Sequence, residues 1–176
     1  MAQLVMLRPS EAPPPSVPDG PSCRLATDAD APELARLLRA AFPEQNWTVE
    51  RVGKDLLDAP DVPRTFVIAE AGALIATASV RYLERFAGHG YVHWVAVDPR
   101  ARGRRLAMIA MGAVLQAFAE DGHDSAILET DDHRLPAIAS YLGQGFIPHY
   151  TDPDHPLRWS RVFAAMAQRR TQTKDK

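Results

Sequence analysis

The sequence predicts an α/β (α+β) fold with a single domain, and three observations lead to this prediction. A contiguous block of strand patterns covers residues 65–97. The last of these patterns turns through Asp98-Pro99 into a loop that opens an apolar-periodic helix. A further strand, helix and strand follow before residue 150. A doubly wound nucleotide-binding sheet is the main alternative, but its strands and helices alternate from the start, and neither G-x-G-x-x-G nor G-x-x-x-x-G-K-[ST] occurs here.

Residues 1–22 are predicted to form a Pro-rich N-terminal arm. Six of the 15 prolines lie between Pro9 and Pro21, a density that excludes a helix. Ahead of them, residues 3–7 (QLVML) fit either a short strand or a disordered terminus.

Two helices are predicted after the arm. The first has Asp30 as its N-cap and Glu33 at the capping-box position, and it ends near Pro43. The second begins at Thr48. Their apolar residues at helical spacing are Leu34, Leu37, Leu38 and Ala41 in the first helix, and Val49, Val52, Leu56 and Leu57 in the second.

Three strands are predicted next. Residues 65–71 and 73–83 form a hairpin around Ala71-Gly72, and residues 91–97 form a third strand. Strict alternation in the third strand puts Tyr91, His93, Val95 and Val97 on one face, and Val92, Trp94 and Ala96 on the other.

Residues 94–107 (WVAVDPRARGRRLA) predict a phosphate-binding loop. Amide groups at the start of a helix have no intrahelical partners, and the helix dipole adds positive charge there. The loop adds four arginines, which are Arg100, Arg102, Arg104 and Arg105. A basic surface turn is the alternative interpretation.

The remaining elements are a helix, a strand, a second helix and a C-terminal helix. The first helix has apolar residues at helical spacing along one face, namely Leu106, Ile109, Ala113 and Ala117. Residues 126–130 form the strand. Residues 134–146 (RLPAIASYLGQGF) form a short helix that carries Tyr141 and closes on Gly145-Phe146, before the next strand. Trp159, Val162, Phe163 and Met166 have the spacing of an amphipathic helix, favoured here over a final strand. That choice leaves a sheet edge open, for which residues 4–7 are a candidate, and residues 169–176 form a polar, frayed tail.

Composition restricts the class of protein. The 176 residues suffice for one core, and a net charge of −2 gives no electrostatic case for nucleic-acid or membrane binding. Cys23 is the only cysteine, which excludes an intrachain disulfide and fits a reducing, cytoplasmic compartment. No apolar run is long enough to span a bilayer or to form a signal-peptide core.

The two motifs together resemble those of the GNAT superfamily of acetyl-CoA-dependent N-acetyltransferases, over roughly residues 23–150. The family's phosphate loop reads Arg/Gln-x-x-Gly-x-Gly/Ala, and here it is Arg102-Gly103-Arg104-Arg105-Leu106-Ala107, with Arg105 in place of the second glycine. The family's second motif reads Asn-x-x-Ala-x-x-x-Tyr followed by Leu-Gly-Phe. Here Arg134 replaces the asparagine, while Ala137 and Tyr141 are in register.

The resemblance implies a GNAT-type fold, with a mixed central sheet flanked by helices, over residues 23–168. It also implies that acetyl-CoA binds and that Tyr141 protonates the departing thiolate, with simple packing of Tyr141 as the alternative. The residues implied to bind the cofactor are Val95, Ala96 and Val97 on the strand, through the backbone of Val95 and Val97, and Arg102, Gly103, Arg104, Arg105, Leu106 and Ala107 in the loop.

A general base is harder to place. Family members often use a carboxylate on the strand before the loop, but residues 91–97 contain none, and only His93 titrates near neutral pH there. A histidine buried in the sheet is the equal alternative, and Glu129 and Glu84 are the candidate carboxylates. Asp131-Asp132-His133 is interpreted as a loop facing the acceptor and not as a metal site.

The predicted activity is direct transfer of acetyl from acetyl-CoA to a primary amine of a small-molecule or peptide acceptor, without a metal. Acceptor contacts are expected around residues 42–47 and 86–89. A non-catalytic acyl-CoA-binding module and a transferase for longer acyl groups remain alternatives, because Arg105 and Arg134 depart from the family pattern. A monomer and a homodimer are both compatible with the sequence.

Overall fold

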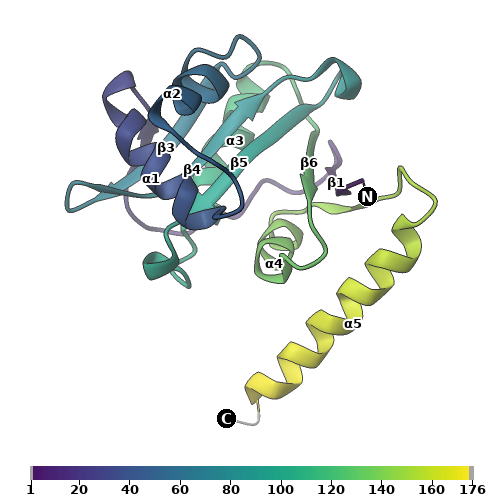
Figure 1. The fold of residues 1–176 in the computed structure, drawn as a ribbon. Coiled ribbons are helices and arrows are strands. Elements are labelled where there is room, and N and C mark those ends of the chain that lie inside the picture. The colour runs from purple at the N-terminus through teal and green to yellow at the C-terminus, as the bar shows by residue number, and fades with distance from the viewer. Residues whose placement is uncertain (1, 175–176) are drawn as a thin grey trace.

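The seven strands form one mixed sheet with helices on both faces (Figure 1). This computed structural model describes residues 2–174. The strands are β1 (Leu4–Arg8), β2 (Cys23–Leu25), β3 (Arg64–Glu70), β4 (Ala73–Arg81), β5 (Gly90–Val97), β6 (Ala126–Thr130) and β7 (Ile147–His149). The helices are α1 (Ala31–Ala41), α2 (Val49–Val52), α3 (Leu106–Glu120), α4 (Leu135–Gly143) and α5 (His155–Lys174), with shorter turns of helix η1 (Asp28–Asp30), η2 (Gly53–Leu57), η3 (Glu84–Phe86) and η4 (Pro99–Ala101). The predicted fold class is confirmed. The predicted strands and helices lie within a few residues of those observed, except that the C-terminal helix extends further than predicted.

The order of strands in the sheet is β2-β3-β4-β5-β6-β1-β7. All neighbours are antiparallel except β5 and β6. Residues 4–7 do form a strand, which is one of the two alternatives expected. This strand pairs with β7, the strand after Gly145-Phe146, but it does not form the edge of the sheet. β1 instead lies between β6 and β7, where Leu4 pairs with Thr130 and Leu7 pairs with both Ile127 and Ile147.

Two buried clusters cover the two faces of the sheet. One cluster contains side chains of α3, α4 and α5, and the other contains those of α1, α2 and η2. In β1, Leu4 and Met6 belong to the first cluster while Val5 packs on the opposite face, which is the alternation expected of a strand between two layers. Both faces of the central strands are therefore buried.

The N-terminus of α1 is not capped in the way that was predicted. Asp30 makes no side-chain cap to α1, and Glu33 instead binds Arg36 and the Leu74 amide. The capping box lies three residues earlier, where Asp30 is the third residue after Thr27 and its carboxylate accepts from the Thr27 amide at 2.8 Å. The 3-10 turn η1 was not predicted, because its three residues carry no apolar periodicity.

The helix α5 confirms the predicted C-terminal helix. It contacts α4, and its buried Trp159 belongs to the same cluster as Ile138 of α4. Arg158 pairs with Asp132 and donates to the Ala2 carbonyl at 2.7 Å. The helix continues to Lys174, so it includes most of the predicted polar tail, whose last two residues lie outside the described part. No helix in residues 2–174 is both long enough and apolar enough to cross a membrane.

The Pro-rich arm lies along α3. A Cβ added at Gly112 of α3 would lie 2.4 Å from a methyl group of Val17, and one added at Gly20 would lie 2.4 Å from Ile109. Arm and helix are therefore in close contact, and the glycines make room for the facing side chains.

Candidate functional site

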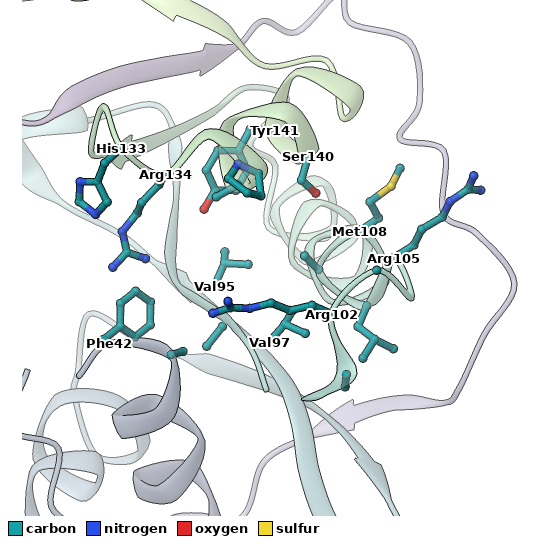
Figure 2. Close-up of a pocket in the computed structure, with 18 of the residues that line it drawn as sticks. Phe42, Val95, Val97, Arg102, Arg105, Met108, His133, Arg134, Ser140 and Tyr141 are labelled. Atoms are coloured by element: carbon teal, nitrogen blue, oxygen red, sulfur yellow. The ribbon is translucent and has the colours of Figure 1, made fainter. Parts of the chain in front are cut away.

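A cavity of about 760 Å³ lies where β5 and β6 separate. These two strands pair only through Gly90 with Ala126 and Tyr91 with Ile127. Beyond Tyr91 they diverge, and the end of β5, the start of α3 and one face of α4 enclose the space between them (Figure 2). A volume of this size suits a small-molecule site.

A bulge in β5 sets which side chains face this cavity. The register between β4 and β5 shifts between Thr77 and Ser79, and Trp94 adopts a φ of +43°. The predicted alternation along β5 is therefore wrong. Trp94 packs in the α1 and α2 cluster, 5.3 Å from the His93 ring, whereas Val95 and Val97 face α3.

The loop after β5 is built on Asp98. Its carboxylate is buried, accepts from the Arg100 amide at 3.0 Å to cap η4, and pairs with the side chains of Arg36 and Arg100. These hydrogen bonds hold the pKa of Asp98 well below its usual range, with Arg100 as the largest cause. The fixed turn delivers the chain to the start of α3.

Two residues of the loop have positive φ. Gly103 has a φ of +81° and Arg105, the residue before α3, has a φ of +57°. The position where the family has its second glycine therefore does need a left-handed backbone, and an arginine adopts it here.

The four loop arginines divide into two pairs. Arg102 and Arg105 line the cavity. In Figure 2 the Arg102 side chain extends across the cavity, whereas that of Arg105 extends outward from the start of α3. Arg100 is held by Asp98, and Arg104 forms two hydrogen bonds with Glu70, at 2.8 and 2.6 Å. The Arg104 side chain therefore pairs with β3 and is not in the cavity lining. The other predicted cofactor residues do line the cavity, namely Val95, Ala96, Val97, Arg102, Gly103, Arg105, Leu106 and Ala107.

Tyr141 also lines the cavity, from the facing side of α4. It is 8% exposed, and burial raises its pKa to about 12. Its ring also packs against Phe146, with ring centroids 6.3 Å apart, so it contributes to the core as well. Figure 2 shows its hydroxyl directed toward the space above Val95.

His93 does not belong to the cavity lining. It lies on the α1 and α2 face of the sheet, with its Nε2 3.1 Å from Arg81 Nη1. Burial, reinforced by the charge of Arg81, lowers its pKa to about 3. The imidazole is therefore neutral at pH 7 and a very weak base, so its predicted role as general base finds no support in this geometry.

The two carboxylate alternatives also lie outside the lining. Glu129 on β6 is held by two hydrogen bonds from Arg85, at 2.9 and 2.5 Å, and by one from the Tyr91 hydroxyl at 3.0 Å. Glu84 is exposed in η3.

Several residues that line the cavity were not individually predicted from the sequence as site residues. Met108 and Ser140 line the cavity, as do Glu44 and Arg134, which form an ion pair at 3.2 Å. His133 lines it as well, so the predicted orientation of its loop toward the site is consistent with the structure. The available signal was the helical period of α4, because Arg134, Ala137 and Tyr141 recur on one side. Within the described residues, no group of three or more His, Cys, Asp or Glu side chains could hold a metal ion.

Comparisons with known proteins agree with this architecture. A family model described as the acetyltransferase (GNAT) family matches residues 31–146. The mycothiol acetyltransferase of Nocardia farcinica is 30% identical over 146 residues, which cover 77% of this chain and 48% of that protein. That of Streptomyces bingchenggensis is 32% identical over 151 residues, which cover 81% of this chain and 48% of that protein. The chain therefore spans about half the length of the curated relatives it matches.

Solved structures share the fold. A GCN5-related N-acetyltransferase from Sphaerobacter thermophilus superposes with a TM-score of 0.63 at 21% identity, over 85% of this chain and 50% of that chain. The ribosomal-protein-S18-alanine N-acetyltransferase of Escherichia coli gives a TM-score of 0.60 at 16% identity, over 73% and 79%. The sequence match over most of the domain, with the shared fold, shows that the chain belongs to the GNAT acetyltransferase family.

Proposed function

We propose that this protein is an N-acetyltransferase that moves an acetyl group from acetyl-CoA to a primary amine by direct transfer. The observation that carries the proposal is a single cavity that reaches from the cationic start of α3 to the hydroxyl of Tyr141. One end suits a phosphate, because amides, the helix dipole, Arg102 and Arg105 all favour negative charge there. The other end offers a proton donor.

The residues along the cavity fit coenzyme A. The Val95 and Val97 side chains make its floor apolar, and the backbone of β5 diverges from β6 there, so it can pair with the amides of the pantetheine arm. Arg105 would contact a phosphate with its side chain and so offset the loss of glycine at its position. Acetyl-CoA would supply the activated acyl group, whose carbonyl carbon bonds to the amine nitrogen as its bond to sulfur breaks.

Tyr141 is proposed to protonate the departing sulfur. Its raised pKa of about 12 keeps the hydroxyl protonated at neutral pH, so it is present as a donor when the thiolate forms. The amine must attack in its deprotonated form, and the proton that its nitrogen loses on forming the amide replaces the one that Tyr141 donates. Positioning of the two substrates would supply much of the remaining acceleration.

The ammonium proton of the acceptor needs a path out of the cavity. Glu44 and His133 line the cavity and have side chains that can accept a proton, so they replace His93, Glu129 and Glu84 as candidates to receive it.

A non-catalytic acyl-CoA-binding module and a transferase for a longer acyl group are the competing functions. Arg105 and Arg134 motivate the first, since both depart from the family pattern. The curated relatives are named mycothiol acetyltransferases, and amines related to mycothiol stay candidates to be tested, because this chain corresponds to only half of those proteins.

The test measures coenzyme A release from acetyl-CoA and from longer acyl-CoA donors over a panel of amines, beside a binding titration with coenzyme A. Acetyl-dependent release that requires an amine is the expected result. Binding without release from any donor would favour the module.

Tyr141→Phe keeps the ring and removes the proton donor. We expect kcat to fall roughly 100-fold or more, with the melting temperature and coenzyme A affinity unchanged. Tyr82→Phe is the matched control, because Tyr82 donates its hydroxyl hydrogen to Asp121 outside the cavity. Equal effects of the two substitutions on kcat would remove the case for Tyr141.

A further inference from the structure

Arg134 brings positive charge to the cavity at a place apart from the phosphate loop. Figure 2 shows Arg134 and Phe42 on one side of Tyr141 and Arg105 on the other, with the Arg102 side chain between them. The charge of Arg134 also acts on Tyr141, whose pKa it lowers against the larger effect of burial. Arg134 therefore lies at the transfer end of the cavity and not at the pyrophosphate end.

Protein groups contact one face of the Arg134 guanidinium and its Nε atom, and they leave the two Nη atoms available to a ligand. Its central carbon lies 4.4 Å from the centroid of the Phe42 ring, and Phe42 is in turn packed edge-to-face on Trp94 at 5.0 Å. Its buried Nε lies 3.3 Å from the Asp131 carboxylate without forming a hydrogen bond. The side chain is therefore positioned by packing and by local charge, which together fix its direction into the cavity.

The contact on the cavity side of Arg134 is weak and replaceable. Glu44 accepts one hydrogen bond from Nη2 at 3.2 Å, and the Glu44 side chain is 58% exposed. Exposed ion pairs of this kind contribute little, since water competes for both partners. A second carboxylate that reached Arg134 with both oxygens would make two parallel hydrogen bonds and would displace Glu44 readily.

Resting on the proposed function, we infer that Arg134 binds a carboxylate of the acceptor, which is therefore a small amine of the amino-acid class. Such a molecule carries the two charges that match this pair, because its carboxylate replaces Glu44 on Arg134 while its ammonium is attracted to the released Glu44. Arg134 is the residue before α4, and Tyr141 follows it by seven residues, about two helical turns. The bound amine would therefore be directed along the same side of the helix toward the acyl group.

The first experiment compares each standard amino acid with its own primary amide as an acetyl acceptor, at saturating acetyl-CoA. At least one acid is expected to react with a kcat/KM roughly 10- to 100-fold above that of its amide, the range for one charge-assisted contact. In Arg134→Gln this preference should disappear through a higher KM for the acid, while the values for the amide and for acetyl-CoA change little. Arg51→Gln is the matched control, because Arg51 also stacks on an aromatic ring, that of Trp47 at 4.3 Å, and pairs with a carboxylate, that of Asp55.

A second measurement does not need turnover. With coenzyme A present, N-acetyl amino acids should raise the melting temperature more than their amides do, and this difference should vanish in Arg134→Gln but not in Arg51→Gln. Equal use or equal binding of acids and amides by the wild type would overturn the inference and leave the acetyltransferase proposal intact. A loss of coenzyme A affinity in Arg134→Gln would also overturn it, since the charge would then serve the cofactor. Absence of turnover with carboxylate-dependent binding would instead count against the proposed reaction alone.

Discussion

Arg105 has a backbone conformation that a residue with a side chain adopts at a cost. Its φ of +57° is in the left-handed region, which disfavours L-residues by about 1 to 2 kcal/mol relative to the right-handed region. Glycine has no such preference, but it loses more freedom on folding, by about 0.5 to 1 kcal/mol.

Arg105→Gly is therefore expected to raise the free energy of unfolding by about 0.5 to 1 kcal/mol, measured by urea denaturation. Coenzyme A affinity should not rise, because one cationic donor leaves the cavity. Arg102→Gly is the control, since Arg102 has an ordinary φ of −61° and should lose stability on the same change. A less stable Arg105→Gly would show that the side chain contributes more than the strain costs.

His93 gives a second test at the level of one residue. With a pKa of about 3, it is already neutral throughout the range in which amine acetylation is measured. His93→Gln should leave the rising limb of kcat/KM against pH where it is, and it should change the rate far less than the 100-fold typical of a lost general base. Disappearance of the limb in this variant alone would restore His93 as the base.

The sequence grouped site residues as the structure does where the type of a residue determines its local surroundings, while the roles of these residues stay predictions. The cavity contains eight of the nine predicted cofactor residues and Tyr141, because glycine, basic residues and a helical period mark a loop that opens a helix. Two features of the site had no signal in the sequence. A tryptophan at positive φ does not follow from alternation, and the partner of Arg104 is Glu70, which lies on a different strand.

At the level of elements, α3 packs on β5 at a point where only glycine fits. A Cβ at Gly90 would lie 2.3 to 2.6 Å from three ring atoms of Phe118, which is 1% exposed and has no room to withdraw. The contact sets how closely α3 approaches the strand that forms the cavity floor.

Gly90→Ala is expected to lower the free energy of unfolding by about 1 to 3 kcal/mol, the usual cost of overpacking a core. Gly143→Ala, in a helix and with open space around it, should be neutral or slightly stabilising under the same urea titration. An unchanged midpoint in Gly90→Ala would mean that the helix can shift without cost.

Elements with strong periodicity were predicted to within a few residues, and the limits of the others have physical causes. The strand of residues 126–130 was predicted with its observed ends, and α5 was predicted from four apolar residues. The place of β1 in the sheet was not predicted. Pairing between strands far apart in the sequence depends on which strand edges are still unpaired when the rest of the sheet has formed. Likewise, the sequence allows Asp30 either to cap α1 or to complete the capping box of η1. The second arrangement forms because Glu33 binds Arg36 and the Leu74 amide and is not available for a capping box at α1.

For the whole molecule, Asp98 links stability to pH. Its carboxylate joins α1 to the loop through Arg36 and Arg100, and its pKa is held below the ordinary value of 3.8. A lowered pKa stabilises the folded state at pH values above 3.8, and this contribution is lost as the pH falls below that value.

Asp98→Asn should therefore lower the melting temperature at neutral pH and should flatten the acid loss of stability between about pH 4 and pH 2, where one proton changes the free energy by up to about 1.4 kcal/mol per pH unit. Asp58→Asn, at an exposed position in the same protein, is the control. Parallel acid profiles for Asp98→Asn and the wild type would contradict the assignment of this linkage to Asp98.

The position of β1 has a consequence for how the protein is made. Among the strands of this sheet, β1 leaves the ribosome first, and the two strands that flank it, β6 and β7, leave last. Until then, the apolar Leu4–Leu7 segment has two unpaired edges and nothing to cover it, the condition that favours aggregation and binding by chaperones. The sheet can close only after its last strand is made, so its folding depends on residues 4–8 remaining accessible until residue 149 has left the ribosome.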